Sequence, residues 1–272
     1  MKKVKNKNKK LLYVTIGTTM ILVAMIGLLG WGLARLVASV KPDYKIDSRV
    51  ENVEAYAAEH ADLPVKGWIK IEGTDIDYPI VFDGQGINVH DPSKDFLWMA
   101  NDVNELTNMV FVLGHNIRNV SKHPLIKDPD HTEFEQLPSF MYLDFAKKNE
   151  YIQYTIDGQD YLYKIFSVSI VNDDKLNYQT GNLTKEKLRQ YITESLSDSY
   201  YKYDVDVNEN DNILALTTCT RFFGVNSDYA LKVDARMVRD NEKVKDYSVI
   251  AKSNYKEVEK MMKEGVENEG NA

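Results

Sequence analysis

The sequence predicts a mainly β fold: a closed or nearly closed barrel with helices packed around it, joined to one N-terminal transmembrane helix. Three observations support this fold class. Short apolar segments of β-branched and aromatic residues recur between residues 67 and 237, separated by turns rich in Gly, Asp and Asn. Few segments of the same region have the period of an amphipathic helix. A long uncharged stretch near the N-terminus has the length of a membrane span. Many short strands with few helices are typical of a barrel.

The first 36 residues predict a membrane anchor. Leu11 to Ala34 is a run of 24 residues without a charge, long enough to cross a bilayer as a helix. The lysines before it predict a cytoplasmic N-terminus. A cleaved signal peptide would have a shorter apolar core and a small-residue cleavage site, neither of which fits. We expect a basic cytoplasmic tail at 1–10 and a transmembrane anchor at 11–36.

The remainder of the chain is acidic. The 272 residues have a net charge of −7, to which the first 40 contribute +7 through six lysines and Arg35. Residues 41–272 therefore carry −14, which disfavours nucleic acid as a partner because binding to phosphates needs an excess of Lys and Arg. Such acidity is otherwise typical of a soluble surface. The length is ample for one globular domain with its own core.

Residues 37–62 predict a linker followed by an amphipathic helix. Pro42 ends the anchor helix. Ser48, with Glu51 three residues later, predicts a capping box and hence a helix near 48–59. The apolar residues expected to share one face of this helix are Ile46, Val50, Val53 and Ala57. We expect the helix to pack on the outside of the main domain.

Residues 63–240 predict the barrel itself. The expected strands cover residues 68–71, 76–81, 109–113, 151–156, 161–171, 213–219 and 229–237. Asp157-Gly158 predicts a hairpin turn between two of them. A helix over about 184–197 precedes the strand at 213–219.

The C-terminal part of the chain is more polar. In the strand at 229–237, apolar and polar residues alternate, so Lys232 and Arg236 are expected to be solvated on its polar face. Residues 241–272 predict a charged tail that contains a surface helix over 254–264.

Cys219 is the only cysteine of the chain, and it ends the apolar segment ILALTTC. One cysteine forms no internal disulfide, so a thiol at the end of a strand outside the membrane is a candidate nucleophile. The alternative, a buried cysteine that packs as a small hydrophobic residue, is common, and the strand alone favours neither. The sequence has no pair of cysteines and no spaced pair of histidines, so we expect no metal and no cofactor.

A cysteine nucleophile needs a neighbouring base or cation, and histidine is the usual partner. Of five histidines, only His115 follows directly on an apolar strand, after Gly114. The others lie at a helix end or in loop-like segments: His60, His90, His123 and His131. A histidine at a strand end is more often structural when taken alone. Together with Cys219 at another strand end, it predicts a catalytic pair at one rim of the barrel.

Three segments, in this order, resemble the successive signatures of the sortases, the membrane-anchored cysteine transpeptidases of Gram-positive bacteria. They are GWIKIEGTDIDYPIV at 67–81, LGHN at 113–116 and LTTC at 216–219. The resemblance extends over about residues 45–238. The family's cysteine motif is Thr-Leu-x-Thr-Cys, and this chain has Ala215 at its first position. The anchor, the early helix and the helix before the cysteine strand resemble class B.

The resemblance implies an eight-stranded barrel with the site in a groove at its rim. Cys219 would attack the sorting signal of a secreted surface protein or pilin and form a thioacyl enzyme. His115 would protonate the leaving amine and then accept a proton from the incoming amine. That amine would belong to a peptidoglycan precursor or cross-bridge, or to a pilin lysine. The chain would cross the membrane once, with an extracellular catalytic domain.

One position departs from the family. Sortases have an arginine at the start of the strand after the cysteine, where it holds the substrate and stabilises the oxyanion, and here that position holds Tyr229. A phenol donates a hydrogen bond but carries no positive charge. Arg221 is a candidate replacement, the alternative being an exposed loop arginine without a role. Thr218 is a candidate substrate contact, or simply a β-branched strand residue.

Two functions therefore stay open. The first is a working transpeptidase of class B type, with a hydrolase that ends at water as a variant. The second is a sortase-like scaffold or accessory protein in pilus or surface-protein assembly, whose catalysis is impaired by the substitution at Tyr229.

Overall fold

The computed structural model describes residues 45–82, 96–116, 132–176, 178–224 and 228–269. Contacts divide the chain into two units: Met1–Tyr44 with Lys243–Asp246, and Lys45–Glu242 with Tyr247–Ala272. All helices and strands given below belong to the second unit. The predicted anchor at 11–36 lies outside the described residues. Among those that are described, no helix combines the length and the apolar character needed to span a bilayer.

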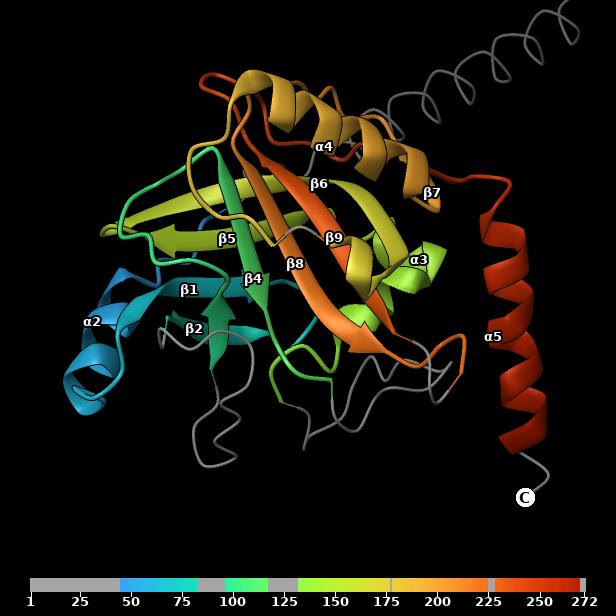
Figure 1. Ribbon diagram of the computed structural model, residues 1–272, viewed down its shortest axis with the longest axis horizontal. Coiled ribbons are helices and arrows are strands. Elements are labelled where there is room, and N and C mark those ends of the chain that lie inside the picture. The colour runs from blue at the N-terminus through green and yellow to red at the C-terminus, as the bar shows by residue number, and fades with distance from the viewer. Residues whose placement is uncertain (1–44, 83–95, 117–131, 177, 225–227, 270–272) are drawn as a thin grey trace, which may run out of the picture. The chain divides into compact units, whose positions relative to one another are not determined.

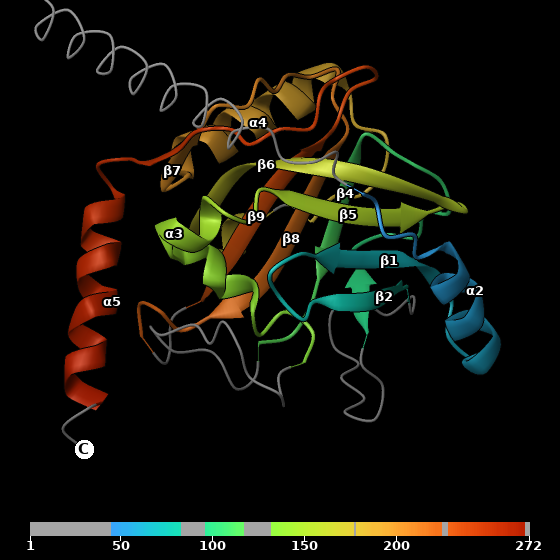
Figure 2. The same cartoon turned by 180° about the vertical axis from the view of Figure 1, so that it is seen from behind.

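Eight strands form a closed barrel in the order β1-β2-β3-β4-β8-β9-β6-β5 (Figures 1 and 2). Their bounds are β1 Val65–Ile71, β2 Asp77–Val81, β3 Leu97–Met99, β4 Met109–Leu113, β5 Tyr151–Ile156, β6 Gln159–Asn172, β8 Ile213–Thr220 and β9 Tyr229–Met237. The predicted barrel is confirmed, and each expected strand is present. β3 was not expected, because three residues are too few to show a strand period.

The direction of β4 relative to β8 positions the site. These two neighbours are parallel, and Leu113 of β4 pairs with Thr217 of β8. Parallel neighbours end at the same edge of a sheet, so the residue after β4 and the last residues of β8 meet at one rim of the barrel. His115 and Cys219 each lie two residues beyond this pair.

Helix α2 (Val50–Glu59) is the predicted N-terminal helix, but the predicted capping box is wrong. Arg49 is the N-cap residue and its side chain makes no cap bond, while Ser48 Oγ accepts a hydrogen bond of 3.4 Å from Val50 N and not from Glu51 N, as a capping box would require. The Ser48 hydroxyl also bonds to Asp160. Arg49 forms a bidentate ion pair with Asp77, with N–O distances of 2.8 and 2.7 Å. This pair fastens the start of the helix to β2.

Helix α4 (Lys185–Asp198), predicted over 184–197, covers the outer face of β6, β8 and β9 (Figure 1). Its residues Leu188 and Ile192 pack in one apolar cluster with Phe166 of β6 and Ala215 of β8. This cover excludes water from strand residues that would otherwise face solvent.

The expectation that Lys232 and Arg236 are solvated is wrong: their exposed fractions are 4% and 2%. Helix α4 covers Lys232, and Arg236 is bound by Glu242 and Asp206. Beneath α4, the Lys232 ammonium lies 3.2 Å from a carboxylate oxygen of Asp234 and donates to Ser195 Oγ at 2.8 Å. The Tyr191 hydroxyl donates to Asp234 at 2.5 Å. Strand β9 is thus buried on both faces, and pairing replaces solvent around its charges.

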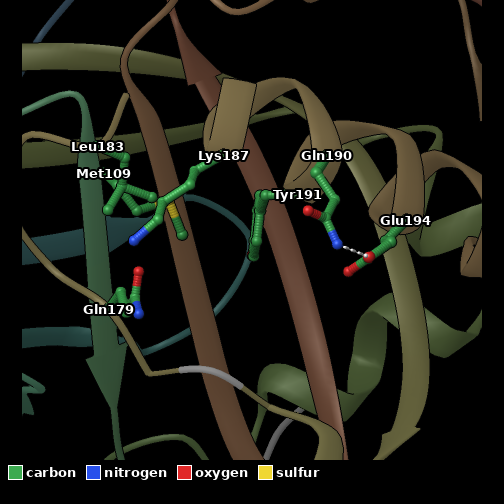
Figure 3. A pocket seen from close by; sticks show the side chains of 7 residues that line it. All are labelled: Met109, Gln179, Leu183, Lys187, Gln190, Tyr191 and Glu194. Atoms are coloured by element: carbon green, nitrogen blue, oxygen red, sulfur yellow. Dashed lines mark hydrogen bonds between the residues drawn. The ribbon is translucent and has the colours of Figure 1, made fainter. Parts of the chain in front are cut away.

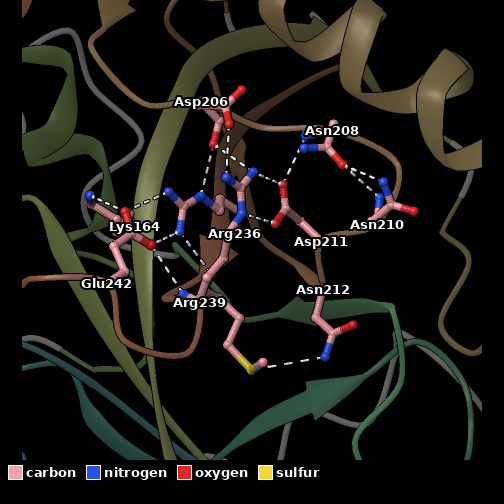
Figure 4. A network of polar contacts seen from close by, with 10 residues as sticks. Lys164, Asp206, Asn208, Asn210, Asp211, Asn212, Arg236, Arg239 and Glu242 are labelled. Atoms are coloured by element: carbon pink, nitrogen blue, oxygen red, sulfur yellow. Dashed lines mark hydrogen bonds and ion pairs between the residues drawn. The ribbon is translucent and has the colours of Figure 1, made fainter.

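Arg236 belongs to a network of charged side chains near the end of β9 (Figure 4). It binds Glu242 through two N–O contacts of 2.5 and 2.8 Å, and Lys164 of β6 binds the same carboxylate at 2.8 Å. Hydrogen bonding to Arg236 holds the pKa of Glu242 well below its usual range. Arg239 pairs with Asp211 at 2.7 Å. These contacts join β6, β9 and the segment after β9. The network therefore has a structural role.

The C-terminal region contains more structure than a charged tail. β10 (Val249–Ala251) pairs with β7 (Tyr201–Tyr203) in a separate two-stranded sheet. The predicted helix over 254–264 is present as α5 (Tyr255–Glu269). It packs on β7, since the ring centroids of Tyr255 and Tyr201 are 5.0 Å apart. The remaining short helical elements are η1 Leu137–Met141, α3 Leu143–Ala146 and η2 Asp173–Lys175.

Lys232→Met should destabilise the fold, because it leaves the Asp234 carboxylate buried without its cation. Removing one partner of a buried ion pair costs about 3–5 kcal/mol. We expect that loss in the free energy of unfolding, measured by urea denaturation with tryptophan fluorescence. The double variant Lys232→Met/Asp234→Asn should recover most of it. A single variant as stable as the wild type would show that the pair does not support the fold.

Candidate active site

Cys219 is the only exposed residue of β8, and the other residues of this strand are buried. It pairs with Ala230 of β9. Its carbonyl oxygen accepts a hydrogen bond from Asn116 Nδ2 at 3.1 Å. A thiol at the surface does not fit the alternative of a cysteine packed inside the core. The backbone at Cys219 is thus held from both neighbouring strands while its sulfur stays reachable.

Hydrogen bonds between the segment after β4 and strand β8 continue beyond the last residue pair, Leu113 and Thr217. Gly114 N donates to the Thr217 carbonyl at 3.3 Å, and the bond from Asn116 reaches Cys219 itself. Residues opposite each other on neighbouring strands are about 4.8 Å apart and point to the same face. The register therefore places His115 and Cys219, the two residues singled out from the sequence, at the same rim of the barrel.

Close packing explains the glycine before His115. A Cβ atom at position 114 would lie 2.6 Å from a side-chain atom of Leu97 and 2.7 Å from one of Phe134. Thr218, which is buried, donates from its hydroxyl to the Gly114 carbonyl at 2.7 Å. This bond ties β8 to the end of β4. It supports the structural alternative for Thr218 over a contact with substrate.

Two neighbours hold the His115 imidazole. The Trp98 ring of β3 lies against it, with centroids 4.5 Å apart and planes at 53°. The carboxylate oxygens of Glu133 lie 3.0 and 3.2 Å from Nδ1, and one of them accepts a hydrogen bond from the His115 backbone N–H at 2.5 Å. The His115 side chain is 25% exposed and that of Glu133 only 3%. The imidazole is thus fixed yet open to solvent.

Glu133 was not found from the sequence. It follows His115 by 18 residues, with no strand or helix pattern between them to predict that the chain returns. The one available indication was its place directly before Phe134, Leu137 and Phe140, which look like the core of a helix. All three are fully buried, and the neighbouring Glu133 is buried with them.

Arg221 and Tyr229, the two candidates for the role of the family's arginine, lie on either side of the turn between β8 and β9. Arg221 is exposed, and its charge lies near enough to affect the Cys219 thiol. Tyr229 pairs with Thr220, and its ring packs against Phe223 with centroids 5.1 Å apart. Of the two, only Arg221 brings a positive charge to the thiol.

The surroundings of Cys219 favour its neutral form. Partial desolvation raises the pKa of the thiol, and the Asp173 carboxylate raises it further, whereas Arg221 lowers it. Asp173 begins η2 after β6 and accepts a hydrogen bond from the Tyr178 hydroxyl. Because the thiolate is the nucleophilic form of cysteine, a base would have to remove this proton for Cys219 to act as a nucleophile.

A separate pocket of about 190 Å³ lies beside α4 (Figure 3). Its lining residues are Met109, Gln179, Leu183, Lys187, Gln190, Tyr191 and Glu194. None of these is His115, Cys219 or Arg221, so the pocket is distinct from the candidate site. Within the described ranges, no three His, Cys, Asp or Glu residues gather as a metal ion would require.

Comparisons with known proteins identify the family. The family model of the sortase domain matches residues 69–238. Sortase B of Staphylococcus aureus is 25% identical over 174 residues, which cover 59% of this chain and 65% of that protein.

Two solved structures are also similar. Clostridium perfringens sortase B is 27% identical, with a TM-score of 0.53 over 70% of this chain and 98% of that chain. A substrate complex of Staphylococcus aureus sortase B is 19% identical, with a TM-score of 0.52 over 71% of this chain and 94% of that chain. The family match covers more than half of the chain and includes both His115 and Cys219. The chain belongs to the sortase family, and within it to class B.

Proposed function

We propose that this chain is a membrane-anchored cysteine transpeptidase, which cleaves the sorting signal of a secreted protein and transfers it to an amine of the cell wall or of a pilin. One observation supports the proposal: β4 and β8 are parallel neighbours, so His115, two residues after β4, and the exposed Cys219, near the end of β8, belong to one rim of the barrel. The anchor rests on the uncharged stretch from Leu11 to Ala34. The substrate and acceptor classes rest on the family resemblance.

The first half-reaction transfers the acyl group to the enzyme. His115 takes the proton of the Cys219 thiol, and the sulfur attacks the carbonyl carbon of the scissile peptide bond. The C–N bond then breaks, and His115 gives the proton to the leaving amine. The products are a thioacyl enzyme and the released C-terminal part of the sorting signal.

The second half-reaction transfers the acyl group from the enzyme to the acceptor amine, by the same steps in reverse order. The neutral amine of the acceptor attacks the thioester carbonyl carbon, and His115 takes the proton that this nitrogen loses. The C–S bond breaks, and the proton returns to the sulfur of Cys219. The result is a new peptide bond and the free enzyme. If water attacks instead, the same steps give hydrolysis.

Charge on the carbonyl oxygen must be stabilised in both halves. Arg221 is the better candidate because its guanidinium is charged and offers several donors to one oxygen. Its influence on the Cys219 thiol indicates that it lies near the reacting atoms. The Tyr229 hydroxyl is the alternative donor, although its ring is engaged with Phe223.

The second candidate function is a sortase-like scaffold with impaired catalysis. Two observations favour it: Tyr229 at the position of the family's arginine, and a thiol whose neutral form is stabilised. In that case the barrel would bind surface proteins or pilins without forming a thioester.

The two functions differ in whether an acyl group reaches Cys219. The full chain, purified in detergent, is incubated with varied sorting-signal peptides and analysed by mass spectrometry. We expect an acyl adduct on Cys219, its absence in Cys219→Ala, and an amide product when an amine is added. Folding of the variant is checked by circular dichroism. Failure to form an adduct with any peptide would support the scaffold, and cleavage without transfer would indicate a hydrolase.

Arg221→Ala should lower kcat by about 10²-fold, since loss of one oxyanion donor costs about 10²–10³ in kcat. Tyr229→Phe should change kcat little. Arg189→Ala, which removes an exposed arginine on α4, is the matched control for loss of surface charge. Steady-state kinetics with one peptide substrate compare the three variants. Full activity of Arg221→Ala with a strong loss in Tyr229→Phe would assign the donor role to the tyrosine.

Asp173→Asn should lower the pKa of the Cys219 thiol, because it removes a negative charge that stabilises the protonated form. The thiolate fraction at neutral pH then rises, and iodoacetamide should alkylate the variant several-fold faster. The midpoint of the rate against pH should move to lower pH. Asp174→Asn, the exposed neighbour, is the control and should behave like the wild type. An unchanged profile in Asp173→Asn would show that this carboxylate does not act on the thiol.

A further inference from the structure

We propose that Glu133 is the positioning residue for His115: its carboxylate keeps the ring proton on Nδ1, so that the lone pair on Nε2 serves the Cys219 thiol. The site then works as a Cys-His-Glu triad. The role in catalysis rests on the proposed transpeptidase function. The position of the proton on Nδ1 does not depend on that function, and the spectroscopic experiment below tests it separately.

The contacts between the two residues are unusually complete. Both carboxylate oxygens of Glu133 lie within 3.2 Å of His115 Nδ1. One of them also accepts the His115 backbone N–H. In the other direction, the His115 carbonyl accepts a hydrogen bond from Phe134 N at 3.1 Å. The backbone and the ring of His115 are thus tied to the same two consecutive residues.

The backbone of Glu133 is strained to make this possible. Its φ is +47°, in the left-handed region that residues with a side chain seldom adopt. Strain of this kind persists only where surrounding contacts impose it, and it is frequent at functional sites. Here the buried Phe134 on one side and the bonds to His115 on the other supply those contacts.

The chemistry of the two groups fixes the tautomer. A neutral imidazole has one N–H and one lone pair, and an ionised carboxylate only accepts hydrogen bonds. Nδ1 beside Glu133 must therefore be the donor, which leaves the lone pair on Nε2. When His115 takes the thiol proton, the carboxylate stabilises the imidazolium that forms, as in other triads. Contact with Trp98 restrains rotation of the ring.

Glu135 shows that burial of a carboxylate here does not by itself give this role. It is as buried as Glu133, with exposed fractions of 2% and 3%. Its carboxylate accepts a hydrogen bond from Thr132 N at 3.1 Å, within its own turn. Glu135 therefore serves as the matched control for the loss of one buried negative charge.

The kinetic test uses the full chain and one peptide substrate. Glu133→Gln should lower kcat by about 10²-fold, within the range that general acid–base catalysis supplies, and leave KM nearly unchanged. Glu133→Asp should restore part of the loss, and Glu135→Gln should retain the wild-type kcat. A wild-type kcat in Glu133→Gln would overturn the proposal, as would an equal loss of kcat in both glutamine variants.

The spectroscopic test needs neither activity nor a variant of Glu133. Wild-type chain with histidine labelled by nitrogen-15 is examined by NMR at alkaline pH, where imidazole rings are neutral. The His115 resonances are assigned by their loss in His115→Gln. We expect the proton on Nδ1, and a proton on Nε2 would overturn the proposal. Failure of the transpeptidase assay with the proton on Nδ1 would instead count against the proposed function alone.

Discussion

The parallel pairing of β4 with β8 is the constraint on which the site depends. Antiparallel neighbours would have placed the ends of these two strands at opposite rims. Three hydrogen bonds continue the pairing beyond β4: from Gly114 to Thr217, from Thr218 to Gly114, and from Asn116 to Cys219. All three join the segment that carries the histidine to the strand that carries the cysteine. The candidate site is therefore part of the barrel wall, not of a loop added to it.

Around this frame, charge is distributed unevenly. Asp173 and partial desolvation disfavour the thiolate of Cys219, whereas Arg221 opposes them. A thiol that rests in its neutral form reacts only when a base is aligned with it, which makes the orientation of His115 decisive. The carboxylate of Glu133 is buried beside this imidazole. In the proposed mechanism, the Cys219 thiol stays protonated until His115 accepts its proton.

The sequence predicted the barrel and the positions of His115 and Cys219 at strand ends, because strand periods and strand ends are local features. Contacts between distant segments could not be predicted in this way. The alternation in β9 suggested a solvated face, and only the packing of α4 shows why Lys232 is buried. Ser48 suggested the N-cap, but the helix begins one residue later, with Arg49 as its N-cap residue, and Ser48 bonds to Asp160 and Val50 N. Glu133 was missed because a return of the chain over 18 residues leaves no periodic pattern.

Intramolecular cross-linking tests the central claim most directly. In His115→Cys, Cys219 is the only other cysteine, and a disulfide needs Cα atoms within about 7 Å of each other. The register of β4 and β8 predicts that mild oxidation joins the two thiols almost completely, which mass spectrometry detects as protection from alkylation until a reductant is added. His60→Cys, at the end of α2, should give no such protection. Full alkylation of both thiols in oxidised His115→Cys would contradict the account.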